Sequence, residues 1–132
     1  MSNRFTMAFT AGPEHIDAMG HVNNAVWVQW MERIATAHWE ADARPEHVAA
    51  YVWVVTRHEI DYRGNIAEDE QVLAETVIPE GPTGARFDRH IVFRDKSGKE
   101  LVRARSTWAM IDKASGRLMR VPEEVASPFL TD

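Results

Sequence analysis

The sequence contains no cysteine among its 132 residues. This absence excludes disulfide bonds, thiolate nucleophiles and cysteine-bound zinc, and it agrees with a reducing cytoplasm. Long apolar runs are also missing: no stretch approaches the ~18 residues of a transmembrane helix, and the opening MSNRFTMAFTAG lacks the apolar core of a signal peptide. We therefore predict a cytoplasmic protein without a membrane partner.

Basic residues are in the minority and are scattered along the chain. Lys and Arg number 15 against 20 Asp and Glu, which gives a net charge of −5. A nucleic-acid-binding surface needs clustered basic side chains, so this pattern argues against a nucleic-acid partner. The composition, 45% hydrophobic and 27% charged, is that of an ordinary globular protein. Its length predicts one domain over residues 1–132.

One segment has the periodicity of an amphipathic helix. From residue 24 to about residue 41, apolar residues recur at intervals of three and four, and they are Val26, Trp27, Trp30, Met31, Ile34 and Ala35. Asn23 or Asn24 can cap the first turn, because an Asn side chain accepts from backbone N–H groups that have no partner in the helix. A loose apolar alternation over residues 4–10 predicts a strand ahead of it.

The rest of the chain has the character of strands joined by tight turns. Segments rich in Val, Ile, Thr and aromatic residues are separated by short runs of Pro, Gly, Asp and Ser, a pattern that favours antiparallel neighbours. We predict strands at 51–62, 71–78, 85–94, 100–111 and, more briefly, 118–121. Because no second helix is predicted where parallel crossovers would need one, the fold class is α+β.

The loop before the helix gathers groups suited to chemistry on a carbonyl. Asp17 is followed by Gly20, His21 and Asn24, and Asn24 lies where the helix begins. A helix N-terminus offers unpaired N–H groups and partial positive charge, which stabilise a developing oxyanion. Asp17 would then act as a nucleophile or as the base that activates water. Capping and turn formation explain the same residues without catalysis, and His15, Asp17 and His21 are also conceivable metal ligands, although no helical ligand pair supports a metal site.

At this point the chain resembles a known family. The motif DAMGHVNN, followed by VQWMER, is similar to the corresponding region of acyl-CoA thioesterases of the 4-hydroxybenzoyl-CoA type. Further segments resemble the same family in the same order, so that the resemblance covers nearly the whole chain. These segments are IDYR at 60–63, EDE at 68–70, TWAMID at 107–112 and RVPE at 120–123.

The loop is also similar to that of plant-type acyl carrier protein thioesterases, which reads D-x-N-x-H-V-N-N. His21, Val22, Asn23 and Asn24 match this pattern, but Met19 stands where the first asparagine is expected. A site in which Asp, Asn and His act together would therefore be incomplete. This departure favours Asp17 as the main catalytic group, with His21 as an auxiliary that orients water or substrate.

The resemblance implies a hotdog fold, in which a curved antiparallel sheet of five to six strands wraps one long helix. It also implies a homodimer or homotetramer with the active site at a subunit interface. The implied reaction is hydrolysis of an acyl-CoA thioester, with Asp17 acting on the carbonyl and the backbone N–H of Asn24 holding the oxyanion. No metal or other cofactor is implied, since coenzyme A is part of the substrate.

Several residues are candidates for substrate contacts. Trp27 lies on the first helical turn and could shape an acyl pocket, although aromatic residues at this spacing more often belong to the core. Met19 and Asn23 flank the predicted catalytic groups. Arg89 with His90 is the candidate for binding the CoA phosphates.

Two rival functions are compatible with the same fold. One is hydration of an enoyl-CoA, as in (R)-specific hydratases, whose loop places an Asp and a His five residues apart, whereas Asp17 and His21 are four apart. The other is a non-catalytic acyl-CoA-binding protein, because a fold alone does not fix a function. Replacing Asp17 would separate an enzyme from a binding protein.

Overall fold

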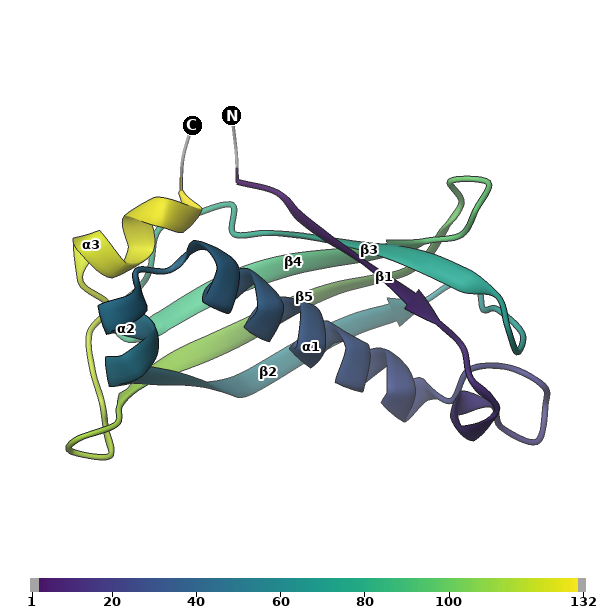
Figure 1. Cartoon of the computed structure of the whole chain (residues 1–132), viewed down its shortest axis with the longest axis horizontal. Coiled ribbons are helices and arrows are strands. Elements are labelled where there is room, and N and C mark those ends of the chain that lie inside the picture. The colour runs from purple at the N-terminus through teal and green to yellow at the C-terminus, as the bar shows by residue number, and fades with distance from the viewer. Residues whose placement is uncertain (1–2, 131–132) are drawn as a thin grey trace.

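The computed structural model describes residues 3–130 and shows one long helix lying across an antiparallel sheet (Figure 1). The strands are β1 (Phe5–Thr10), β2 (Tyr51–Tyr62), β3 (Gln71–Val77), β4 (Arg86–Arg94), β5 (Glu100–Asp112) and β6 (Arg117–Leu118). Their order is β1-β3-β4-β5-β2, with β6 paired to the end of β5. Strands β1 and β2 are therefore the two edges of this order.

The strand predictions agree with the structure except at their ends. The range of β2 is as predicted, and β1, β3, β4 and β5 differ from their predictions by one residue at an end. The prediction of a strand at 118–121 is wrong in extent, because β6 ends at Leu118. Beyond it the Met119 N–H still donates to the Met110 carbonyl of β5 at 3.0 Å, and the Val121 N–H donates to the Gly84 carbonyl at 2.9 Å.

Helix α1 (Asn24–Asp42) confirms the amphipathic prediction. Its buried residues are the six apolar residues expected from the spacing together with His38. Asn23 is the N-cap, and its Oδ1 accepts from the Ala25 N–H at 2.9 Å. A polar side chain on this apolar face, His38, was not anticipated from the periodicity.

Short helices follow α1 and end the described chain. Helix α2 (Pro45–Ala50) has a proline in its first turn, a position that proline favours because its missing N–H is not needed there. Helix α3 (Glu123–Ala126) follows Pro122. Two 3₁₀ turns, η1 (Pro13–His15) and η2 (Ser127–Phe129), also begin with or contain a proline near their start. The sequence analysis predicted none of these four elements.

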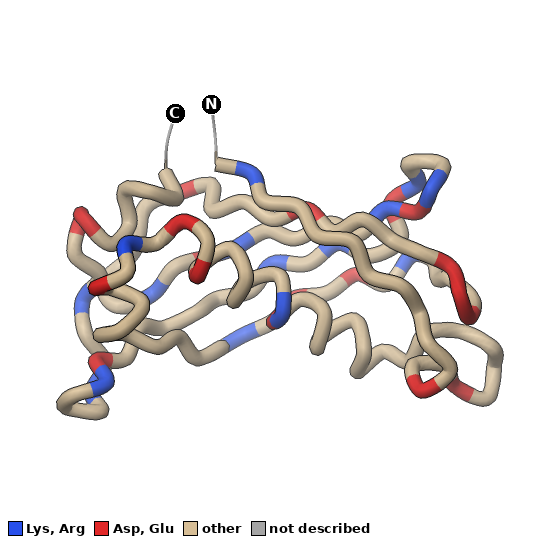
Figure 2. Tube along the Cα trace, in the orientation of Figure 1, with Lys and Arg blue, Asp and Glu red and all other residues tan. Residues whose placement is uncertain are grey.

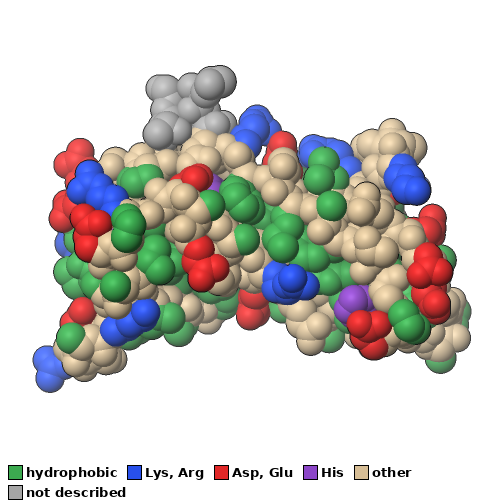
Figure 3. Space-filling view, in the orientation of Figure 1, with side chains coloured by type: hydrophobic (Ala, Val, Ile, Leu, Met, Phe, Trp, Pro, Cys, Tyr) green, Lys and Arg blue, Asp and Glu red, His purple; other side chains and the backbone are tan. Residues whose placement is uncertain are grey.

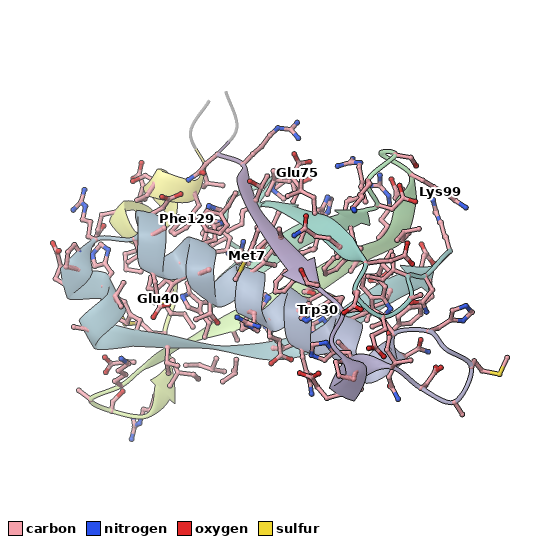
Figure 4. All side chains as sticks on the ribbon, turned by 45° about the vertical axis from the view of Figure 1, so that its right-hand side comes forward. Met7, Trp30, Glu40, Glu75, Lys99 and Phe129 are labelled. Atoms are coloured by element: carbon pink, nitrogen blue, oxygen red, sulfur yellow. The ribbon has the colours of Figure 1, made fainter. Side chains whose placement is uncertain are left out.

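The core has two aromatic clusters along α1. Toward the N-terminus of α1, the ring of Trp27 lies 5.0 Å from that of Phe93, and Trp30 stacks on Phe9 at 5.2 Å. Toward the C-terminus of α1, Trp39 stacks on Phe129 at 5.8 Å. Figure 4 shows Trp30 and Phe129 at these two separate ends of the helix. Within residues 3–130, no helix combines the length and the apolar character needed to cross a membrane.

Candidate active site

The loop before α1 closes on itself around Asp17. Ile16 and Val22 form an isolated antiparallel bridge, and the Asp17 N–H donates to the His21 carbonyl at 2.8 Å. The turn between them contains Gly20, whose φ of 77° is in the left-handed region that glycine adopts without steric cost. The backbone thereby brings Asp17 back beside the residues that lead into α1.

The Asp17 carboxylate is fixed by one of its oxygens. Oδ1 accepts from the Met19 N–H at 2.8 Å and from the His21 N–H at 3.2 Å. Oδ2 has no hydrogen-bond partner among residues 3–130, and the residue is half-buried. The carboxylate is therefore oriented by the backbone while one oxygen stays available to a substrate or to water.

The N-terminus of α1 directly follows the loop that contains Asp17. Asn23 caps Ala25 with its side chain and Val26 with its carbonyl, at 2.9 Å each. The Asn24 N–H has no acceptor in the part of the chain that the structure describes. An N–H group of this kind is the expected partner for an oxyanion.

Asn65 is a structural contributor that sequence spacing did not reveal. Its Oδ1 accepts from the Val22 N–H at 2.9 Å, and its Nδ2 donates to the Val22 carbonyl at 3.1 Å. The same Oδ1 accepts from the Ile66 N–H at 2.8 Å. Asn65 thus ties the loop before α1 to the connection between β2 and β3. The two residues are 43 positions apart, so local pattern could not pair them.

Other side chains of this segment are exposed. Met19 is 78% exposed, and His21 and Asn24 are exposed. The structure brings the backbone N–H of His21 to Asp17, but no hydrogen bond joins the His21 ring to any residue between 3 and 130. The auxiliary role of His21 stays a prediction.

The three residues weighed as metal ligands do not converge. His15 Nδ1 accepts from the Gly12 N–H at 2.9 Å, and its ring packs edge-on against Trp30 at 5.4 Å. Among residues 3–130, no group of three His, Cys, Asp or Glu side chains is close enough to hold a metal ion. The metal hypothesis for His15, Asp17 and His21 is therefore not supported by this geometry.

Acidic residues collect at this end of the molecule. Figure 2 shows the loop before α1 and the turn at residues 68–70 as acidic segments near one another. Within the turn, Glu70 Oε1 accepts from the Ala67 N–H at 2.7 Å.

The candidate pair for CoA phosphates is not brought together. Arg89 is only 6% exposed and faces α1, whereas His90, the next residue of β4, faces the other side of the sheet. Arg89 Nη1 donates to His38 Nδ1 at 2.8 Å and to Thr76 Oγ1 at 3.1 Å. The two side chains therefore lie on opposite faces of the sheet, and their role in binding CoA phosphates stays a prediction.

Trp27 is a core residue in this chain. Its side chain is fully buried between Trp30 and Phe93. Its Nε1 has no hydrogen-bond acceptor among residues 3–130. The ring therefore packs beneath the first turn of α1. It has no exposed surface that could contact an acyl group, and its role in an acyl pocket stays a prediction.

The pH dependence of stability should report on His38. Burial, and secondarily the charge of Arg89, lower its pKa to about 4, although Asp42 partly opposes this. Between pH 6.5 and pH 4 the unfolded chain therefore binds a proton that the folded chain does not, so stability falls as the pH falls through this window. The loss should reach about 3 kcal/mol near pH 4.

Urea denaturation at pH 7, 5.5 and 4.5 measures this loss. The matched variant is His38→Gln, which keeps a side-chain acceptor for Arg89 and removes the titrating ring. We expect the wild type to lose more stability on acidification than the variant. An equal loss in both proteins would show that His38 is not the responsible group.

Comparisons with known proteins find similar sequences and structures. Residues 11–129 match the family model described as the thioesterase-like superfamily. A chloroplast palmitoyl-acyl carrier protein thioesterase from Gossypium hirsutum is 36% identical over 75 residues, which are 56% of this chain and 18% of that protein. The chain thus spans less than a fifth of the curated relative it matches.

Solved structures resemble most of the chain. An acyl-ACP thioesterase from Bacteroides thetaiotaomicron has a TM-score of 0.83 at 23% identity, over 98% of this chain and 54% of that one. A probable thioesterase from Escherichia coli has a TM-score of 0.82 at 17% identity, over 96% and 98%. A 1,4-dihydroxy-2-naphthoyl-CoA thioesterase from Synechocystis has a TM-score of 0.75 at 17% identity, over 92% of both chains. These likenesses confirm the predicted hotdog fold.

Proposed function

The chain belongs to the thioesterase-like superfamily, and on this premise we propose that it hydrolyses an acyl-CoA thioester to a free acid and coenzyme A. The observation that carries the proposal is the state of Asp17. One carboxylate oxygen is held by two backbone N–H groups, and the other has no partner among the described residues. The unpaired N–H of Asn24 follows at the start of α1.

The proposed chemistry uses these two groups on one carbonyl. The Asn24 N–H and the positive end of the α1 dipole stabilise the negative charge that forms on the thioester oxygen. Asp17 either attacks the carbonyl carbon, giving a mixed anhydride that water then hydrolyses, or removes a proton from the attacking water. In both routes the C–S bond breaks and the sulfur leaves as the CoA thiolate. The steps call for water and protein groups, so we propose no metal or redox cofactor.

A second copy of the chain would complete the site. Strand β2 is an edge strand, and Val52 and Val54 on its outer face are 43% and 44% exposed. Such an edge is prone to pair with another strand. The Tyr62 hydroxyl donates to the Asn24 carbonyl at 3.4 Å, so the C-terminal end of β2 lies beside the start of α1.

Antiparallel pairing of two β2 edges would set this end against the Tyr51 end of the partner. The loop of one chain would then face the strands of the other, where Met19 and Asn23 could contact substrate and His21 could orient water. We therefore propose a homodimer, or a tetramer built from it, acting in the cytoplasm.

A panel of thioesters tests the proposed reaction. The panel contains aliphatic acyl-CoAs of increasing length, aromatic acyl-CoAs, and acyl carrier protein thioesters, because the plant relative is named for the carrier-protein substrate. We expect release of free thiol from at least one acyl-CoA, faster than from the matching carrier-protein thioester. Water addition to crotonyl-CoA without thiol release would instead indicate a hydratase. Binding of acyl-CoAs without turnover would indicate a non-catalytic binding protein.

A further inference from the structure

A cavity lies under the C-terminal half of α1. It has a volume of about 210 Å³ and is bounded by α1, β2, β4 and β5. Six of its fourteen lining residues are aromatic, and they are Trp39, Tyr51, Trp53, Phe87, Trp108 and Phe129. In Figure 3 hydrophobic side chains are exposed among acidic groups on the α1 and α2 side of the molecule.

This cavity is separate from the Asp17 loop of the same chain. Its first lining residue on α1, Ala35, is 11 residues beyond Asn24, which corresponds to ~16 Å along the helix. Figure 4 shows Glu40 and Phe129, both lining residues, at the opposite end of α1 from Trp30. The buried aromatic residues around Trp27 fill the space between.

A buried cation forms part of the cavity wall. Arg89 lines the cavity while 6% exposed, and its pKa, lowered by burial to about 10, leaves the guanidinium charged at neutral pH. Its recorded hydrogen-bond partners, His38 Nδ1 and Thr76 Oγ1, are both neutral at that pH. Among residues 3–130, no carboxylate oxygen lies within 4.0 Å of its nitrogen atoms.

The nearest acid in this network is behind the histidine. Asp42 Oδ2 lies 3.2 Å from His38 Nε2, on the far side of the imidazole from Arg89. It also accepts from Asn3 Nδ2 at 2.8 Å. A buried charge without a direct counter-ion is costly, and folded proteins normally pair it. Within residues 3–130, no carboxylate is therefore in direct contact with Arg89.

Two further lining groups are donors without acceptors. The Nε1 atoms of Trp53 and Trp108 are buried and have no hydrogen-bond partner in the described residues. Lys113 and Glu40, both exposed, are the other charged lining residues, and the Lys113 ammonium already donates to the Val48 carbonyl at 3.1 Å. The two buried indole N–H groups and the Arg89 guanidinium could therefore all donate to a bound acceptor.

We propose that the cavity binds an organic carboxylate, with an apolar ring or short chain against the aromatic wall and the carboxylate on Arg89. The match is chemical: guanidinium pairs well with a planar carboxylate, and the walls exclude water from the pair. The small volume and the single buried cation favour a monocarboxylate with an aromatic or medium-length aliphatic body over a polyphosphate. If two β2 edges pair as proposed above, the cavity of one chain lies near the Asp17 loop of its partner, because Tyr51 and Trp53 line it. Binding of a carboxylate to Arg89 requires neither hydrolysis at Asp17 nor this pairing.

Binding of defined carboxylates to the purified protein tests this site. Benzoate and octanoate are titrated alongside their neutral counterparts benzamide and octanamide, and binding is followed by tryptophan fluorescence and by calorimetry. We expect each carboxylate to bind about tenfold or more tightly than its amide, because hydrogen bonds to a charged group are the stronger ones. Equal affinity of acid and amide, or no saturable binding of either carboxylate, would overturn the proposal.

Variants locate the binding. Arg89→Met should remove the preference for the carboxylate while the amide affinity stays, and Arg103→Met, an exposed arginine of β5, is the matched control. If Arg89→Met does not fold, Thr36→Trp, an exposed lining position that retains Arg89, should block entry. Unchanged carboxylate affinity in the blocked variant would contradict the site. Asp17→Asn should bind carboxylates as the wild type does, so loss of catalysis and loss of this site are distinguishable.

Discussion

Replacing Asp17 by asparagine should lower kcat for thioester hydrolysis by roughly 10²- to 10⁴-fold, the range expected for loss of a positioned acid or base. Asparagine keeps the Oδ1 acceptor that receives the Met19 and His21 N–H groups. The loop should therefore retain its shape while the negative charge is lost. Thiol release at saturating acyl-CoA measures kcat, and binding of a non-hydrolysable CoA thioether measures affinity.

Glu14→Gln provides the matched control for this variant. Glu14 is an exposed acid three residues earlier in the same segment. Its carboxylate accepts no hydrogen bond from residues 3–130, and its Oε2 lies 3.9 Å from His15 Nε2. We expect its kcat to stay within about twofold of the wild type, since isolated surface substitutions have small effects. A Glu14→Gln loss as large as that of Asp17→Asn would indicate that the general acidity of this end matters, and not the Asp17 carboxylate.

Replacing Trp27 by alanine should lower the free energy of unfolding by about 3–5 kcal/mol, the usual cost of removing a large buried aromatic ring. Trp27 is fully buried and packs edge-on against Trp30 and Phe93, so its loss leaves a cavity under the first turn of α1. Urea denaturation measures the change. Because Nε1 of Trp27 has no acceptor among residues 3–130, Trp27→Phe should cost much less.

Leu118→Ala is the control for the size of this effect. Leu118 is 57% exposed on β6, so its truncation should change stability by less than about 0.5 kcal/mol. If Trp27→Ala were as mild as Leu118→Ala, the first turn of α1 would not depend on the aromatic cluster beneath it. Trp27 would then not be a stabilising residue of the core.

Much of the fold could be predicted because its signals are local. The spacing of apolar residues gives α1 and its buried face, and β-rich runs between turn residues give the strands. The helix α2 was missed because six residues are too few to show helical periodicity. Its only distinctive signal is Pro45 in the first turn, a position that proline favours but that it also occupies in loops.

The candidate site was predictable only in part. The spacing of Asp17, Gly20 and Asn24 indicated the loop and the helix end, because those contacts are made within a few residues. Asn65 holds the loop from 43 positions away, so only the folded chain reveals it.

The burial of Arg89 could have been predicted from the alternation of residues along β4. Phe87, Arg89 and Ile91 alternate along β4 and all are buried, so the period of two places the arginine on the inner face. The phosphate-binding prediction rested on the positive charge of Arg89, which does not indicate the face of the sheet on which it lies. Strand period was the better guide here, because neighbouring apolar residues fixed the face.

Hydrolysis by Asp17 is the central claim, and product analysis in ¹⁸O-labelled water tests it most directly. Wild-type protein is incubated with an acyl-CoA over many turnovers, beside Asp17→Asn, and both products are identified by mass spectrometry. We expect the wild type to give equal amounts of CoA and free acid, with one solvent oxygen in the acid. The variant should give far less of both products. Intact CoA ester, solvent oxygen added to an ester whose C–S bond is unbroken, or equal turnover by Asp17→Asn would contradict the central claim.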